Sequence, residues 1–114
     1  MDIIRRKPIL WIGDSRKAIR EFSDLARERA GRELARVREG LEPDDRKPMP
    51  SIGIGVFEIR VHVEGAFRVI YIAKLAEGIY VLHAFQKKAQ KTPKSEIELA
   101  RKRYRAMLNE RKAR

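Results

Sequence analysis

Residues 56–85 constrain the fold most, because they hold three strand patterns joined by short turns. Residues 56–63 give the first strand pattern, in which apolar and polar side chains alternate from Phe57 onward, and Glu64-Gly65 then turns the chain. Two further strands are predicted over 67–72 and 79–85. Alternation with a period of two indicates strands, and short glycine-containing connections join antiparallel neighbours. The sequence therefore predicts an antiparallel β-meander.

Helical patterns precede the meander. The apolar run 9–12 is too short for a helix and predicts a strand, while the apolar spacing over 15–29 predicts a helix. Gly31 is expected to break or bend that helix before a second helical stretch, for which Gly40 supplies the C-cap. Residues 42–51 contain three prolines and show no period, which predicts a loop.

A last helix follows the meander. Thr92 is predicted as its N-cap and Pro93 as its first helical residue, because both are preferred at these positions. The complete order is β-α-α-β-β-β-α, which defines a small α+β fold. A length of 114 residues is typical of one domain, so residues 1–114 are interpreted as a single domain.

The charge of the chain is strongly positive and uneven. There are 27 Lys and Arg residues against 16 Asp and Glu residues, a formal net charge of +11. Residues 86–114 hold 11 of the basic residues and three Glu, so they carry +8 and leave +3 for the first 85 residues. This balance favours a polyanionic partner, with nucleic acid first.

Several other classes are excluded by composition. The chain has no cysteine and two histidines, which excludes a disulfide framework, a thiolate nucleophile and nearly any multi-histidine metal centre. No apolar run approaches the roughly 18 residues of a membrane span. Residues 1–8 lack the apolar core of a secretory leader. We therefore expect a cytoplasmic protein with no membrane partner.

Two arginines within the predicted strands are candidate ligands for phosphate. Arg60 shares a sheet face with Glu58 and His62, and Arg68 joins them if its strand has the matching register. An unpaired arginine is costly to bury, so both must face outward or find a partner. Guanidinium groups bind phosphate bidentately, but a cross-strand Glu–Arg pair that solubilises an exposed face explains the pattern equally well.

Lysines cluster where the last strand meets the last helix. Lys87, Lys88, Lys91 and Lys94 could converge on phosphates near the N-terminus of that helix, or could be ordinary solvated surface. His83 lies in an apolar strand and is interpreted as structural. His62 could exchange protons, but the spacing of the sequence identifies no carboxylate partner for it.

The ordered set of motifs resembles the RelE/ParE toxin superfamily, in particular phage-derived HigB-type toxins. The residues that carry the resemblance are Gly55-Val56-Phe57-Glu58-Ile59-Arg60, Phe67-Arg68-Val69-Ile70-Tyr71, Ile79 to Lys88, Lys91-Thr92-Pro93 and Glu96-Ile97 to Ala100. The resemblance implies a type II toxin that cleaves mRNA in the ribosomal A site, with no metal or other cofactor. It also implies a cognate antitoxin, typically a helix-turn-helix protein.

The resemblance assigns roles by position. Arg68 matches the second-strand arginine that contacts the scissile phosphate, and Lys87 and Lys88 match the basic pair that ends the last strand, so these three are the predicted catalytic residues. Arg60, Lys91 and Lys94 are predicted to bind RNA. On this basis Arg68→Ala is expected to abolish toxicity and spare the fold.

The sequence also departs from its relatives. RelE uses a tyrosine near the start of the last helix, where this chain has Thr92-Pro93-Lys94, and HigB toxins use a C-terminal histidine, whereas none follows His83 here. The general acid and base are thus unassigned. Two alternatives remain, a ParE-like inhibitor of DNA gyrase and a non-catalytic phage-derived module that binds nucleic acid or protein.

Overall fold

Five strands form one mixed sheet in the computed structural model, which describes residues 6–114. The elements in chain order are β1 (Ile9–Trp11), α1 (Ser15–Arg20), α2 (Asp24–Arg38), β2 (Arg46–Pro48), β3 (Val56–His62), β4 (Ala66–Ile72), β5 (Ile79–Lys87) and α3 (Lys94–Lys112). The interpretation of residues 1–8 as lacking a leader falls mostly on residues 1–5, which lie outside the described part. Within residues 6–114, no helix is long and apolar enough to span a membrane.

The predicted meander is confirmed, and two short strands extend it. β3, β4 and β5 pair antiparallel, β1 runs parallel beside β5, and β2 forms the opposite edge, giving the order β1-β5-β4-β3-β2. The prediction of a loop over 42–51 is therefore wrong for Arg46–Pro48, which pair with Phe57–Ile59 of β3. Pro48 is compatible with this position because an edge strand needs to pair on one side only.

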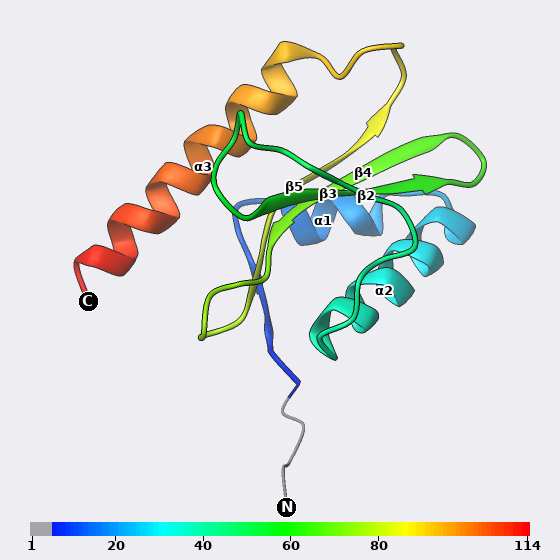
Figure 1. Cartoon of the computed structure of the whole chain (residues 1–114). Coiled ribbons are helices and arrows are strands. Elements are labelled where there is room, and N and C mark those ends of the chain that lie inside the picture. Colours follow the sequence, from blue (N-terminus) through cyan, green and yellow to red (C-terminus); the bar gives the residue numbers. More distant parts are fainter. Residues whose placement is uncertain (1–5) are drawn as a thin grey trace, which may run out of the picture.

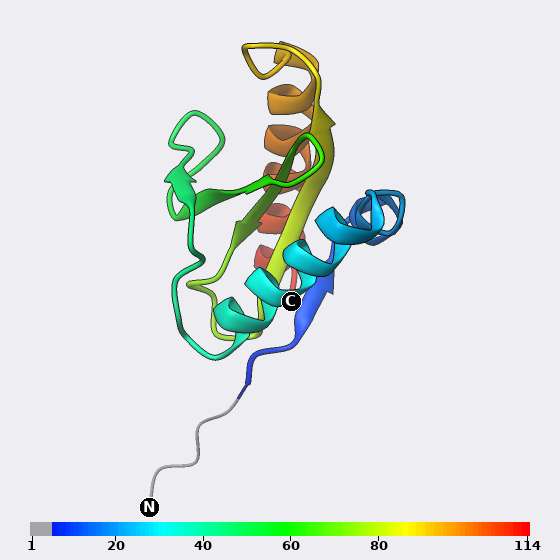
Figure 2. The same cartoon turned by 90° about the vertical axis from the view of Figure 1, so that its right-hand side faces the viewer.

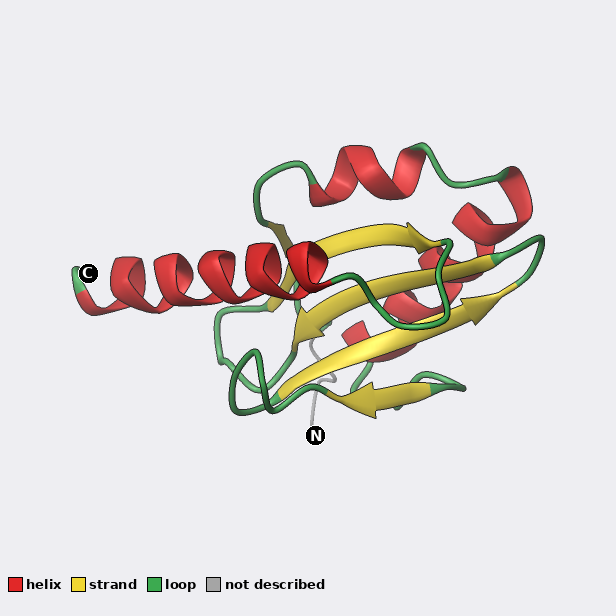
Figure 3. Ribbon diagram, turned by 90° about the horizontal axis from the view of Figure 1, so that it is seen from above, coloured by secondary structure: helices red, strands yellow, loops and turns green. Residues whose placement is uncertain are grey.

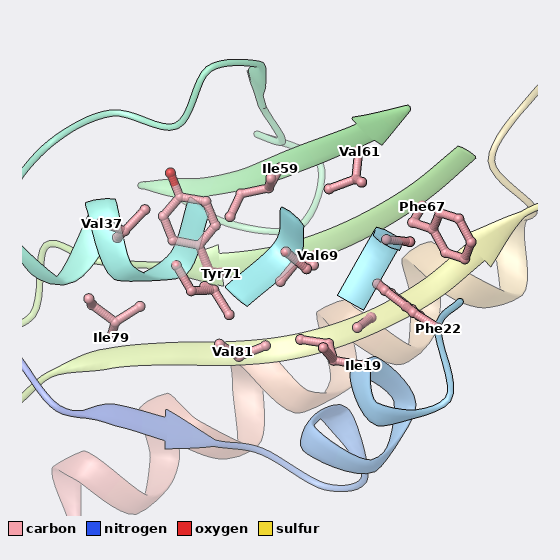
Figure 4. Close-up of a cluster of buried hydrophobic side chains, with 14 residues drawn as sticks. Ile19, Phe22, Val37, Ile59, Val61, Phe67, Val69, Tyr71, Ile79 and Val81 are labelled. Carbon is pink, nitrogen blue, oxygen red and sulfur yellow. The ribbon is translucent and has the colours of Figure 1, made fainter. Parts of the chain in front are cut away.

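Both faces of the sheet are covered. α1 and α2 lie against one face and α3 crosses the other, as Figures 1 and 2 show. The core under α1 and α2 includes Ile59, Val69, Tyr71 and Val81 (Figure 4). The core under α3 is built on the alternate residues of the same strands, among them Val56, Ile70, Ile72 and Leu82. The α+β prediction is thus confirmed, as a sheet between two helical layers.

The first helical region breaks earlier than the sequence analysis predicts. α1 ends at Arg20, and α2 restarts at Asp24 with Ser23 as its N-cap, whose hydroxyl accepts a hydrogen bond from the amide of Ala26 at 3.4 Å. Gly31 lies inside α2 on its exposed face, where it does not interrupt the helix. The break lets Phe22 turn inward, with its ring centroid 4.6 Å from that of Phe67.

Gly40 ends α2 as predicted. It adopts a φ of +82°, a conformation that glycine reaches without steric cost. Its amide donates to the carbonyl of Val37 and that of Leu41 to the carbonyl of Arg36, both at 3.0 Å. These two bonds form a Schellman motif.

The start of α3 is shifted by one residue from the prediction. Pro93 is the N-cap and not the first helical residue, because its ψ of 141° is extended, and Thr92 lies outside the helix. Ala100 and Met107 are the buried residues of α3. Tyr104 packs so closely over Gly53 that any side chain at Gly53 would overlap its ring. These contacts hold the helix against the sheet.

Candidate functional site

The two predicted phosphate-binding arginines lie directly opposite each other. Arg60 of β3 pairs in register with Arg68 of β4, so both side chains project from the α3 face of the sheet. Figure 3 shows these neighbouring strands from the side that carries α3. Like charges placed opposite each other on one sheet face repel. Such a pair needs nearby carboxylates, and the structure provides one for each arginine.

Arg68 is paired with Glu58 inside the protein. Arg68 Nε lies 3.4 Å from Glu58 Oε1, and the two side chains are only 6% and 5% exposed. A second nitrogen, Nη1, donates to the carbonyl of Phe67 at 3.0 Å. The cross-strand Glu–Arg pair considered from the sequence therefore exists, but it is buried and does not solubilise an exposed face.

Glu58 is a functional candidate that the sequence analysis did not select. Its Oε2 is buried and has no hydrogen-bond partner among the described residues. Burial raises the pKa of Glu58 above its ordinary value, and the positive charge of Arg68 opposes the rise. A carboxyl group with a raised pKa and an unpaired oxygen is suited to accept a proton. Its position on the same face as Arg60 was the available signal.

Arg60 is held by Asp45, which comes from the segment before β2. Asp45 Oδ1 accepts hydrogen bonds from Arg60 Nε at 3.0 Å and Nη2 at 2.8 Å. The other oxygen, Oδ2, lies 3.5 Å from His62 Nε2. The structure thus supplies the carboxylate partner for His62 that the sequence spacing does not reveal. It does so because the pairing of β2 with β3 brings this segment alongside His62.

The predicted lysines lie at the end of β5, in the segment that follows it and at the start of α3. Lys87 is partly exposed at the end of β5, where it pairs in register with Ala66. Its positive charge, like that of Arg60, opposes the rise in the pKa of Glu58. The segment 88–93 leaves β5 and turns back over the α3 face of the sheet toward α3 (Figures 1 and 3). Lys88 and Lys91 on this segment are exposed, as is Lys94 at the start of α3.

His83 is positioned as a structural residue. It is 6% exposed, and its Nε2 lies 3.1 Å from Glu96 Oε1 in the first turn of α3. Its Nδ1 lies 3.4 Å from Arg103 Nη1, and Arg103 also donates to Asp14 at 2.8 Å. His83 therefore joins β5, α3 and the turn before α1, which agrees with the structural interpretation.

A separate pocket lies on the other face of the sheet. Its volume is about 460 Å³, and its lining includes Phe57, Tyr71, Leu41 and Arg46 but no predicted site residue. Phe57 and Tyr71 project away from Arg60 and Arg68 because they occupy the alternate positions of β3 and β4. The candidate site is the cationic face and not this pocket.

Taken together, the α3 face carries cations that can bind a phosphodiester and a carboxyl group that can accept a proton. The described residues contain no group of three or more His, Asp or Glu side chains placed to hold a metal ion. These features define a small α+β protein with a cationic site on one face of its sheet.

The comparison with protein families places this chain more narrowly. The sequence model of the family described as phage derived protein Gp49-like (DUF891) matches residues 17–105. Because the match covers most of the chain, the protein belongs to the Gp49-like family. A comparison with curated proteins finds no match.

Proposed function

We propose that this protein is the HigB-type toxin of a type II toxin–antitoxin system and that it cuts mRNA in the ribosomal A site without a metal ion. Membership of the Gp49-like family and an α+β order resembling that of RelE support a toxin-like module. The observation that carries the proposal is the placement of Arg60 opposite Arg68, beside the buried carboxyl group of Glu58.

The proposed chemistry uses the RNA as its own nucleophile. The 2′-hydroxyl attacks the adjacent phosphorus, and Glu58 accepts its proton on the unpaired Oε2 once the side chains that bury this oxygen move aside. Negative charge builds up on the phosphorane oxygens, where Arg60, Arg68 and Lys87 neutralise it. Lys88 assists this stabilisation, and Lys91 and Lys94 bind the RNA backbone next to the scissile phosphate.

The side chains of the site on β3 and β4 differ in how far they are exposed to solvent. Arg60 is partly exposed and His62 is exposed, whereas Arg68 is only 5% exposed. A phosphate therefore meets Arg60 and Lys87 first and reaches the guanidinium of Arg68 only when neighbouring side chains move aside. The requirement for the ribosome fits this arrangement, because a shallow site depends on another body to orient its substrate.

The partner in the cell is proposed to be a helix-turn-helix antitoxin encoded beside this chain. A protein that carries a net charge of +11 is suited to an acidic partner surface. Co-expression of the adjacent reading frame should relieve growth arrest, and the two proteins should co-purify. Growth arrest that persists in the presence of every neighbouring gene product would contradict this partnership.

The decisive experiment is cell-free translation followed by primer extension on the mRNA. We expect cuts whose positions follow the reading frame. Arg68→Lys keeps the positive charge but loses the bidentate contact of the guanidinium with phosphate. It should slow cutting on the order of 100-fold. The matched control is Arg32→Lys on the exposed side of α2, which should cut normally.

The alternative functions give different outcomes in the same experiment. Undamaged mRNA together with trapped gyrase–DNA complexes would replace the proposal with gyrase inhibition. Undamaged mRNA together with normal growth after induction would point to a non-catalytic module. Either result refutes the nuclease proposal.

A further inference from the structure

We propose that His62 is the general acid of this site, which protonates the leaving 5′-oxygen of the RNA, and that Asp45 is the positioning residue that orients it. The inference rests on the proposed function and extends it. Neither the family match nor the resemblance assigns a role to either residue, since the HigB pattern places its histidine near the C-terminus.

The first argument is the order of side chains along β3. Glu58, Arg60 and His62 alternate on one face, so they form a row with Arg60 in the middle and Arg68 opposite it. At the usual rise per residue, the Cα atoms of Glu58 and His62 are about 13 Å apart. A phosphate bound at the arginines therefore lies between a carboxyl group and an imidazole. In-line displacement needs its proton acceptor and donor on opposite sides of phosphorus, and this row provides them.

The second argument is the way in which Asp45 is fixed. Its backbone carbonyl accepts the amide of Arg60 at 2.9 Å, and the amide of the preceding residue, Asp44, donates to the buried Glu33 at 2.6 Å. Asp45 Oδ1 is occupied by Arg60, which leaves Oδ2 to face His62 Nε2 at 3.5 Å. A carboxylate beside one ring nitrogen sets the tautomer and orientation of a histidine.

The third argument is exposure. The side chain of His62 is 58% exposed, whereas that of His83 is 7% exposed and engaged on both ring nitrogens. With Nε2 directed toward Asp45, Nδ1 of His62 is the nitrogen left to meet a substrate. Of the two histidines in the chain, only His62 combines access to the cationic face with a carboxylate partner.

The proton balance of the step is complete. The O2′–P bond forms as the P–O5′ bond breaks, and the proton of the 2′-hydroxyl moves to Glu58. Protonated His62 gives its Nδ1 proton to O5′, while its Nε2 stays directed toward Asp45 Oδ2. The products are a 2′,3′-cyclic phosphate and a 5′-hydroxyl, and exchange with water restores both side chains. Histidine is the side chain that exchanges protons readily near neutral pH.

The test compares two RNA substrates on purified ribosomes under single-turnover conditions. One is a natural mRNA, and the other carries sulfur in place of O5′ at the scissile linkage, a leaving group that departs without being protonated. On the natural mRNA, His62→Gln should slow cutting at least about 100-fold, the usual contribution of a general acid. On the sulfur substrate, His62→Gln and the unmodified protein should cut at the same rate.

The positioning residue is tested with the same pair of substrates. Asp45→Asn should slow cutting of the natural mRNA and recover on the sulfur substrate, at least in part. The control Asp24→Asn removes an exposed carboxylate from α2 and should match the unmodified protein on both substrates.

The outcomes separate this inference from the function on which it rests. If His62→Gln stays slow on the sulfur substrate, or cuts the natural mRNA normally, His62 is not the general acid, although cutting by the unmodified protein still upholds the nuclease. If the unmodified protein cuts neither substrate, the proposed function itself fails.

Discussion

Arg68→Ala should destabilise the fold strongly, because it removes one partner of a buried ion pair. The side chains of Arg68 and Glu58 are 6% and 5% exposed, so Glu58 would be left as an uncompensated buried charge. Breaking a buried pair in this way costs about 3–5 kcal/mol. That is a large share of the roughly 5–15 kcal/mol by which domains are stable. The burial of Arg68 therefore argues against the expectation, drawn from the resemblance, that this substitution spares the fold.

The loss should depend on pH in a defined direction. Burial raises the pKa of Glu58 in the folded protein, and the charge of Arg68 lowers it. Without Arg68 the folded pKa rises further above the unfolded value of 4.5. A carboxyl group with a raised folded pKa stabilises the fold at low pH and loses that contribution as pH rises. The loss in free energy of unfolding caused by Arg68→Ala should therefore be smaller at pH 5 than at pH 7.

Urea unfolding followed by circular dichroism measures both effects. Arg32→Ala is the control, because Arg32 and Glu28 form an exposed pair that should contribute less than about 1 kcal/mol. Joint replacement by Arg68→Met and Glu58→Leu should recover stability, since it removes both charges and retains volume. The reasoning is refuted if Arg68→Ala destabilises no more than Arg32→Ala, or if its deficit grows at pH 5.

Three further substitutions test the packing around α3 and α2. Gly53→Ala should lower the free energy of unfolding by about 1–3 kcal/mol, because the new methyl group overlaps the ring of Tyr104; an unchanged urea midpoint would contradict this contact. Gly31→Ala should instead raise it by about 0.5–1 kcal/mol, since no atom outside its own helix lies within 4 Å of the added carbon, and a lowered midpoint would show hidden strain. Arg111 holds the pKa of Glu77 at about 2, below its ordinary 4.5, so the ionised Glu77 stabilises the fold above pH 4.5 and this contribution is lost as pH falls through about 2. In Glu77→Gln the free energy of unfolding should therefore fall less between pH 4.5 and 2. An unaltered pH profile would exclude the ion pair as the cause.

The parts of the fold set by local pattern were predictable. Alternation along β3, the apolar runs of β4 and β5 and the short turns between them predicted the meander, and strand parity placed Arg60 with Glu58 and His62 on one face. The restart of α2 had a local signal in Ser23 followed by Asp24, which the periodicity of apolar residues outweighed in the sequence analysis.

The remaining features depend on residues distant in the sequence. β2 has only three residues and a proline, so it is defined by its partner strand and not by its own pattern. The pairing of Asp45 with Arg60 and His62 follows from that register, which composition does not specify. The burial of Arg68 results from packing on the α3 face, and strand parity alone carries no information about it.

The parallel pairing of β1 with β5 has a consequence for synthesis of the chain. Ile9–Trp11 emerge from the ribosome early, but their partners, Ile79–Val81, are translated about 70 residues later. Contacts between such distant segments raise the contact order and delay folding until both are available. A product truncated before residue 79 would have β1 without its partner strand, and Arg68 would have β3 on one side but no β5 on the other. Chains that lack β5 would therefore lack an assembled cationic face, so any activity of this site requires β5 to be translated first.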